Sequence, residues 1–307
     1  MNDIGRRRFL TSVVATAGSL LATRPAAAFQ QAEPLRISCQ QVPWAIYFRR
    51  DEKRFDMDEA LAGAAAAGLS AFEPIINSPA QLSSVATRMK EKGLAMRSLY
   101  VEGTLHEEQP AEECFQKVSA IAPAAAMAGT KIMLVRPMPL TNGREVPKSD
   151  EQLTIQARQL DRIGGLLKDH GIQLAWPNHD IELMHSAREF HHMLAGTDPD
   201  RVGLCLDVQW AHRGSGNSQV ALFDLVRLYR KRLVELHLRQ TRDGVFTEAL
   251  GDGDIDYRQL QKLLREMDGP QPHFVLDQAP EKGTPKTMSP VEAHRAGREY
   301  ITQLFGA

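Results

Sequence analysis

The chain of 307 residues carries 37 basic and 38 acidic side chains and has a formal net charge of −1. This charge gives the protein no electrostatic reason to bind nucleic acid or an anionic membrane, and the length suits one large α/β domain. Three cysteines, Cys39, Cys114 and Cys205, cannot all pair with one another. Cys39 and Cys205 lie in apolar runs, where a free thiol behaves as a small hydrophobic side chain, so we predict no structural disulfide.

The first 28 residues have the pattern of an export signal. GRRRFL at 5–10 matches the twin-arginine motif, a moderately apolar stretch follows at 12–22, and the alanines at 26–28 are small residues that a signal peptidase reads. A basic amphipathic first helix is the alternative, which Gly18 and Pro25 disfavour. The stretch is too short for a committed membrane span. We predict a signal peptide over 1–28, export by the twin-arginine translocase to the periplasm, and no stable membrane association.

After this segment, short apolar runs alternate with longer amphipathic ones about eight times, a pattern typical of repeated strand–helix units. The predicted strands are 35–41, 69–76, 94–101, 131–137, 172–178, 202–208, 233–239 and 273–278. Helical spacing is clearest at 58–67, 81–92, 112–127 and 151–170. Glycines that can adopt positive φ follow these helices, at Gly68, Gly93, Gly129 and Gly171. The count favours an α/β fold, a single-domain (β/α)8 TIM barrel over 29–307, rather than an open doubly wound sheet.

Two features of the loops bear on which ligands the protein binds and where. The glycines at 251–253 lack the strand–turn–helix spacing of a nucleotide fingerprint, so no nucleotide cofactor is expected. Stretches rich in proline and glycine at 137–147 and 279–290 follow the fourth and eighth predicted strands. They therefore belong to the face of the barrel where active sites lie, and we interpret them as possible substrate lids.

Three predicted strands end in groups that can hold a divalent metal or move a proton. The segments are LAWPNHDIEL at 174–183, GLCLDVQW at 203–210 and LVELHLRQ at 233–240. Buried parallel strands read as continuous apolar runs, and their carboxyl ends meet at the catalytic face of a barrel. The chain is therefore interpreted as an enzyme with a site near His179, Asp207 and His237.

Taken in order, these segments resemble the sugar phosphate isomerase/epimerase group of xylose isomerase-like TIM barrels, and in particular its secreted twin-arginine branch. WPNHDIEL, LDVQW, HLRQ and GDGDIDY stand where that branch commonly has YHNHDFEF, LDVGW, HVKD and GEGDIDW. The resemblance implies a divalent metal, usually Mn²⁺, Mg²⁺, Co²⁺ or Zn²⁺, held by carboxylates and a histidine on the late strands. It also implies sugar-like substrates with adjacent carbonyl and hydroxyl groups, and a possible homodimer.

The resemblance assigns roles to particular side chains. The implied metal ligands are Asp207, His237, Asp277 and His179. The implied acid–base residues are His179, Glu182 and Glu73. Trp210, Arg239 and Trp176 are candidates for substrate binding. Most have a plainer alternative: Asp207 caps the next helix or pairs with an arginine, His237 and Glu73 are buried structural residues, His179 caps a helix or packs, Glu182 opens a helix at the surface, Arg239 neutralises acidic neighbours, and Trp210 packs.

The chain departs from the family pattern at three positions. Pro177 stands where relatives carry a histidine or glutamate ligand, and it has no side-chain donor to offer. Asp277 takes the place of a ligand glutamate with a side chain one methylene shorter, and Gln240 replaces an aspartate. His179 or Glu182 can complete the coordination that Pro177 leaves short. The pair His191-His192 falls on a predicted helix and is interpreted as solvated surface.

The leading hypothesis is a periplasmic, metal-dependent isomerase, epimerase or carbon–oxygen lyase acting on a sugar, keto-sugar or cyclitol. All three reactions begin with proton loss next to a carbonyl, which a divalent cation assists. Pro177 supports the alternative, a non-catalytic sugar-binding barrel with a degenerate metal site. A nuclease is disfavoured, because that chemistry needs several zinc ions and because the chain without its signal has a net charge of −4.

Overall fold

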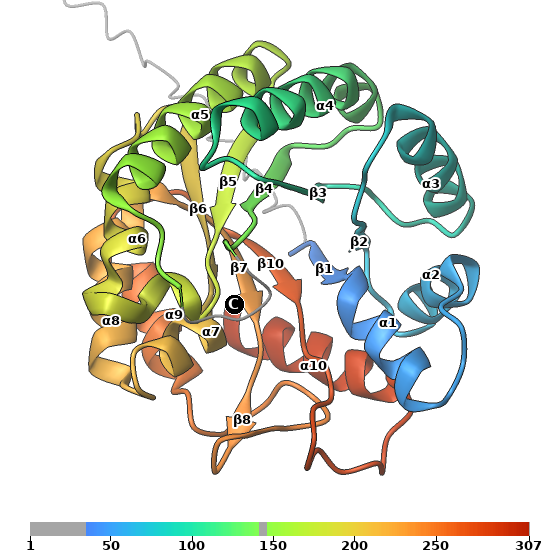
Figure 1. Ribbon diagram of the computed structural model, residues 1–307. Helices are drawn as coiled ribbons and strands as arrows, with labels where there is room; N and C mark the ends of the chain where they lie inside the picture. Colours follow the sequence, from blue (N-terminus) through green and yellow to red (C-terminus); the bar gives the residue numbers. More distant parts are fainter. Residues whose placement is uncertain (1–34, 141–145, 307) are drawn as a thin grey trace, which may run out of the picture. The chain divides into compact units, whose positions relative to one another are not determined.

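Eight parallel strands form a nearly closed barrel in the computed structural model, which describes residues 35–140 and 146–306 (Figure 1). The strands are β1 (Ile37–Gln40), β2 (Ala71–Glu73), β3 (Ser98–Gly103), β4 (Ile132–Pro137), β5 (Gln173–Pro177), β6 (Val202–Asp207), β7 (Leu233–Leu238) and β10 (His273–Leu276). Their order is β2-β1-β10-β7-β6-β5-β4-β3. Isolated parallel bridges join Ala71 to Ala95 and Ile75 to Tyr100 between the two ends of this order. The predicted TIM barrel is confirmed.

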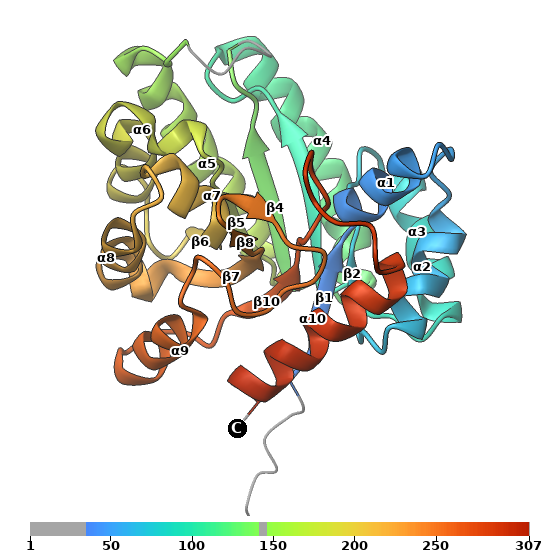
Figure 2. The same cartoon turned by 90° about the horizontal axis from the view of Figure 1, so that it is seen from below.

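Helices surround the barrel, as two views at right angles show (Figures 1 and 2). They are α1 (Gln41–Arg50), α2 (Met57–Ala66), α3 (Pro79–Glu91), α4 (Glu108–Met127), α5 (Asp150–Asp169), α6 (Met184–Ala195), α7 (Val208–Gly214), α8 (Gln219–Tyr229), α9 (Tyr257–Glu266) and α10 (Pro290–Phe305). Short 3-10 turns lie at Ile181–Leu183 (η1) and Arg230–Arg232 (η2), and a hairpin is formed by β8 (Thr241–Arg242) and β9 (Val245–Phe246). In α6 the residues His185, Ser186 and Ala187 have positive φ, so its regular part begins after them.

The predicted elements agree with this arrangement to within a few residues. Each predicted strand contains or overlaps one barrel strand, and the largest shift is in β3, which begins at Ser98 because residues 94–97 form the approach to it. Gly68, Gly93, Gly129 and Gly171 all have positive φ, as expected of residues that end a helix before a strand. Ser149 and Ser289 begin α5 and α10 with complete capping boxes, which fixes where those helices start.

Two apolar layers hold the barrel. The larger one lies between the strands and the helices, and it includes Leu204, Leu206, Leu236 and Leu238. The smaller one contains Tyr100, Leu134, Ala175 and Cys205 and fills the barrel interior. Because side chains alternate along a strand, neighbouring residues of β6 belong to different layers. This alternation leaves the inward positions near the carboxyl ends of the strands for polar side chains.

The three cysteines are buried free thiols, as predicted. In the part of the chain that the structure describes, no helix combines the length and apolar character that a membrane span requires. The predicted signal peptide, residues 1–28, lies outside the described residues. The 279–290 loop, interpreted as a lid, packs on the β8–β9 hairpin, where Glu281 accepts a hydrogen bond of 2.9 Å from the Phe246 backbone. The other predicted lid, 137–147, is described only in part.

A buried histidine predicts how stability depends on pH. The His294 ring stacks on Trp44 with ring centroids 4.5 Å apart, and burial lowers its pKa to about 4. In the unfolded chain this histidine binds a proton with its ordinary pKa of about 6.5, whereas in the folded protein it stays neutral down to about pH 4. The free energy of unfolding therefore falls as the pH falls from about 6.5 to 4. His294→Phe should lose about 3 kcal/mol less unfolding free energy over this pH range than the wild-type protein, as the difference between the two pKa values requires.

Urea unfolding at a series of pH values measures this difference. His170→Gln, a change of a half-buried histidine at the end of α5, is the matched control and should follow the wild-type curve. Parallel curves for His294→Phe and wild type would show that the ring does not stay neutral in the folded protein.

Candidate active site

A cavity of about 230 Å³ opens at the carboxyl ends of the barrel strands. Of the residues singled out in the sequence, Pro177, His179, Asp207, Trp210, His237, Arg239 and Asp277 line it. Gln40, Tyr100, Glu102, Arg136 and Asn178 line it as well. Active sites of TIM barrels lie at this end of the strands. The fold therefore gathers side chains from seven segments far apart in the sequence around one small chamber.

Strand register brings the central side chains together. Asp207 at the end of β6 is paired with His237 of β7. Asp277 follows β10, and its backbone N–H donates to the Leu238 carbonyl at 3.1 Å. Asn178 fixes Asp207 from the other side, because its side-chain oxygen accepts from the Asp207 N–H at 3.0 Å. Asp207, His237 and Asp277 therefore converge from three adjacent strands.

Arg239 joins the two aspartates. Its Nε donates to Asp207 Oδ2 at 3.0 Å, and one Nη atom donates to Asp277 Oδ2. The other Asp207 oxygen accepts from the Trp210 backbone N–H at 3.0 Å. Both plainer alternatives for Asp207, a helix cap and an arginine pair, are therefore realised, and the carboxylate still faces the cavity. We call Asp207, His237, Arg239 and Asp277 the mouth cluster.

The electrostatics of the mouth cluster follow from burial and from this guanidinium. Burial raises the pKa of Asp207 to about 6, although Arg239 opposes the rise. Burial would also raise the pKa of Asp277, but Arg239 and His237 outweigh it and hold that pKa below its ordinary value. Such buried carboxylates are stable only beside a cation. Arg239, with 8% of its surface exposed, supplies that cation.

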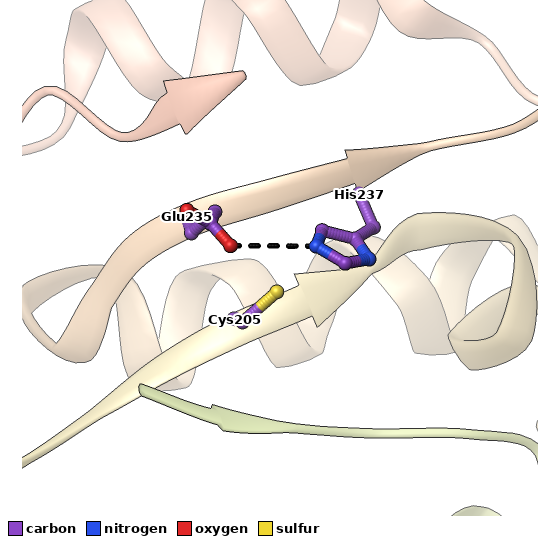
Figure 3. Close-up of side chains that lie close together, drawn as sticks. All are labelled: Cys205, Glu235 and His237. Carbon is purple, nitrogen blue, oxygen red and sulfur yellow. Dashed lines mark ion pairs between the residues drawn. The ribbon is translucent and has the colours of Figure 1, made fainter. Parts of the chain in front are cut away.

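His237 also faces a second group of acidic side chains, deeper in the barrel. Its Nδ1 lies 3.3 Å from Asp277 Oδ2, whereas its Nε2 lies 3.2 Å from Glu73 Oε1 and 3.3 Å from Glu235 Oε1. Figure 3 shows Glu235 and His237 on β7 with Cys205 beside them on β6. We call Glu73, Cys205, Glu235 and His237 the inner cluster.

Burial and mutual repulsion perturb the inner cluster. Burial, followed by the nearby Glu73, raises the pKa of Glu235 to about 8. Burial alone would lower the pKa of His237, but the acidic groups around it raise that pKa well above its ordinary value. Burial raises the pKa of the Cys205 thiol. Buried groups with pKa values perturbed in this way cluster at functional sites.

His179 lines the cavity, but Glu182 does not face it. The His179 side chain is 20% exposed, and its ring centroid lies 6.5 Å from that of Trp210. Glu182 is buried in η1, where Oε2 accepts a hydrogen bond of 2.7 Å from the His179 backbone N–H. Burial, followed by Glu189, raises the pKa of Glu182 to about 7. The Glu182 carboxylate, for which the resemblance implies an acid–base role, is turned into its own loop and does not line this cavity.

Two further predictions need correction. Trp176 is fully buried and packs on Phe190 of α6 with centroids 5.4 Å apart, so it points into the helix layer and not into the cavity. Strand alternation explains this, since its neighbour Pro177 faces inward. His191 and His192 are half-buried rather than solvated, and His191 Nδ1 lies 2.7 Å from the Tyr229 hydroxyl.

Several site residues were not predicted. Arg136 and Glu102 form an ion pair of 2.7 Å in the cavity wall, and Glu235 and Cys205 belong to the inner cluster. The sequence does hold a pattern that points to Glu235 and Cys205. Glu235 precedes His237 by two residues, and Cys205 precedes Asp207 by two. Residues two apart on a strand face the same side, so both belonged with the predicted site.

The mouth cluster can be tested for the divalent metal that the resemblance implies. Asp207, His237 and Asp277 each offer one ligand atom within 4.8 Å of the others, which makes them a possible metal-binding cluster. The Arg239 guanidinium, however, already bridges the two carboxylates, and Pro177 supplies no ligand. A divalent ion bound to Asp207 and Asp277 would lie next to the positively charged Arg239 guanidinium. In this arrangement the mouth cluster does not suit a divalent metal unless Arg239 withdraws.

Comparisons with known proteins agree with this fold. Residues 61–304 match the family model described as xylose isomerase-like TIM barrel. The inosose dehydratase of Bacillus velezensis is 24% identical over 244 residues, which are 68% of this chain and 78% of that protein.

Solved structures of two epimerases superpose on nearly the whole barrel. The D-allulose 3-epimerase of a Methylomonas species has a TM-score of 0.66 at 17% identity, covering 89% of this chain and 98% of its own. The 3-keto-D-glucoside 4-epimerase of E. coli has a TM-score of 0.65 at 17% identity, covering 88% and 99%.

A xylose isomerase-like TIM barrel protein of Mycobacterium smegmatis, solved in complex with magnesium, has a TM-score of 0.62 at 16% identity and covers 89% and 96%. At these identities the structural likeness concerns the fold alone. The family model, in contrast, matches most of the sequence. This chain therefore belongs to the xylose isomerase-like TIM barrel family.

Proposed function

We propose that the protein is an isomerase, epimerase or dehydratase that acts on a sugar, keto-sugar or cyclitol with a carbonyl next to a hydroxyl-bearing carbon. The observation that carries the proposal is the mouth cluster, in which a carboxylate, an imidazole and a guanidinium share one small cavity. Family membership and relatives named as a dehydratase and epimerases support the same class of reaction.

The side chains have complementary parts in such a reaction. Asp207 faces the cavity and removes the proton from the carbon next to the carbonyl. The negative charge that develops on the carbonyl oxygen is stabilised by the Arg239 guanidinium, a buried cation held in place by two carboxylates. The Arg136–Glu102 pair and Gln40 line the wall and can hydrogen-bond hydroxyl groups.

The three reactions share proton removal and differ only in the next step. An isomerase returns the proton to the neighbouring carbon, and an epimerase returns it to the same carbon from the opposite face. A dehydratase expels the neighbouring hydroxyl as water after protonating it. None of these steps needs the divalent metal that the resemblance implies, because the Arg239 guanidinium lies between the two carboxylates and supplies the positive charge.

A non-catalytic sugar-binding barrel is the second candidate. Pro177 favours it, because it removes a ligand position that the family resemblance implies, and so does the replacement of a metal by a side-chain cation. Both candidates bind a sugar in the same cavity. They differ in whether a carbon-bound proton exchanges with solvent.

Solvent exchange separates the two candidates. Incubation of the protein in heavy water with keto-sugars, 3-keto-glycosides and inososes should introduce deuterium next to the carbonyl of a substrate, as followed by NMR. Asp207→Asn should lower the exchange rate at least about 100-fold, which is the usual contribution of a general base. Asp224→Asn, on the exposed surface of α8, is the matched control and should leave the rate unchanged. Binding without exchange of any substrate proton would favour the sugar-binding barrel.

A stability measurement tests the role of Arg239. Arg239→Met removes the cation from two buried carboxylates, and leaving such a charge uncompensated typically costs about 3–5 kcal/mol. Urea unfolding should show a loss of this size. Arg88→Met breaks the exposed pair with Asp58 and should cost less than about 1 kcal/mol. Equal losses in the two variants would mean that Arg239 does not neutralise the mouth cluster.

We also propose export to the periplasm through the twin-arginine pathway, on the basis of residues 1–28 alone. Replacing Arg6 and Arg7 by lysine should leave an uncleaved precursor in the cytoplasm, whereas the wild-type chain should be found cleaved in the periplasmic fraction. Equal periplasmic amounts of the two proteins would exclude this route.

A further inference from the structure

In the inner cluster two carboxyl groups lie beside one imidazole, without the guanidinium that pairs with the carboxylates of the mouth cluster. In the mouth cluster, Arg239 lies between Asp207 and Asp277. In the inner cluster, Glu73, Cys205 and Glu235 are 0% exposed and His237 is 3% exposed. Two carboxyl groups there contact one imidazole nitrogen at 3.2 and 3.3 Å. A single imidazole, which also contacts Asp277, faces both of them.

Several of these buried atoms also have unmet hydrogen-bonding capacity. Among the described residues, Glu73 Oε1, both oxygens of Glu235 and His237 Nε2 make no hydrogen bond of good geometry, although the imidazole nitrogen forms ion pairs with both carboxyl groups. Glu73 Oε2 alone is satisfied, by the Ser98 hydroxyl at 2.6 Å. Buried polar atoms in this number are rare in folded proteins, because each costs about 1–3 kcal/mol. Ligand atoms of Cys205, Glu235 and His237 converge on a common point.

The atoms around that point are metal ligands. Cys205, Glu235 and His237 each offer one ligand atom within 4.8 Å of the others, and Figure 3 shows the three side chains directed toward one another. Glu73 Oε1 approaches the same imidazole nitrogen. Ligands bound tetrahedrally at the usual Zn²⁺ distances are separated by roughly 3.4 Å. The observed separations of 3.2 and 3.3 Å from His237 Nε2 match that value.

We propose that the inner cluster binds one Zn²⁺ or similar borderline ion through Cys205 Sγ, His237 Nε2 and Glu235, the three side chains whose ligand atoms converge. A mixed sulfur, nitrogen and oxygen set suits zinc or cobalt better than magnesium or calcium. Binding releases the thiol proton of Cys205, the second imidazole proton of His237 and any proton shared by the two glutamates. The ion replaces these protons as the positive charge of the barrel interior.

This site differs from the one that the family resemblance implies. It lies beneath the cavity and ties β6 and β7 together. Its link to the mouth cluster is His237, whose Nδ1 remains directed at Asp277 at 3.3 Å. A carboxylate behind a metal-bound histidine fixes the orientation of the ring. The inner ion would therefore position His237 without touching the substrate.

Metal content and a cobalt spectrum test the proposal. The chain is purified without chelators or a nickel column, and its zinc is measured by elemental analysis. A second sample is produced with cobalt, since a Co²⁺–thiolate bond gives a charge-transfer absorption in the near ultraviolet. About one equivalent of ion and this absorption are expected. Cys205→Ser should lose the absorption and bind the ion at least tenfold more weakly, whereas Cys39→Ser, a buried thiol outside the cluster, should retain both.

Two further variants separate the possible locations. Glu235→Gln should also weaken binding at least tenfold, and it serves in place of Cys205→Ser if that variant does not fold. Asp207→Asn should retain the ion, because Asp207 belongs to the mouth cluster and its two oxygens bind Arg239 and the Trp210 backbone. Absence of metal from the wild-type protein after refolding with zinc or cobalt would overturn the proposal. So would an ion that is lost in Asp207→Asn but kept in Cys205→Ser. These readouts do not depend on activity, so the proposed function is tested separately.

Discussion

Neutralisation of buried carboxylates at one end of the barrel is the constraint around which this structure is built. Asp207 ends β6 and Asp277 follows β10, on either side of β7, and both are buried, so neither carboxylate can be hydrated fully. Arg239, the residue that follows β7, meets this requirement because its guanidinium reaches both Oδ2 atoms. A planar group with several donors can bridge two carboxylates in a way that a lysine ammonium cannot. The bridge also fixes the positions of the strand ends that form the cavity.

His237 connects this bridge to the barrel interior. One ring nitrogen faces Asp277 at the mouth, and the other faces Glu73 and Glu235 below. The register of β6 and β7 explains the two levels, since Asp207 is paired with His237 and Cys205 with Glu235. A change in the protonation or metal binding of the inner cluster would therefore alter the mouth cluster, because the His237 ring contacts both. The same barrel thus carries a solvent-facing level suited to substrate and a dry level suited to an ion.

The departures from the family pattern have local consequences that are visible in the contacts. Gln240 replaces a charged residue, and its side chain binds the turn after β7: Oε1 accepts from the Ile255 N–H at 3.1 Å, and Nε2 donates to the Gly251 carbonyl at 2.9 Å. A Cβ on Gly253 would lie 2.2 Å from the Thr241 carbonyl oxygen, so only glycine allows this close approach. The GDGDIDY turn is therefore a support for the end of β7. Its likeness to the family reflects backbone packing.

The sequence by itself determined the barrel and the approximate place of its site. Strand and helix periods, glycines after helices and polar groups at strand ends are local patterns, and they sufficed to predict eight strands and to place Asp207 and His237 at one end, whereas Asp277 was assigned through the family resemblance. Tertiary structure decided which way side chains turn and which partners they meet. Glu182 faces its own loop, Trp176 faces the helix layer, and Arg239 reaches across to two strands. These outcomes depend on register and twist between segments distant in sequence, which no local period encodes.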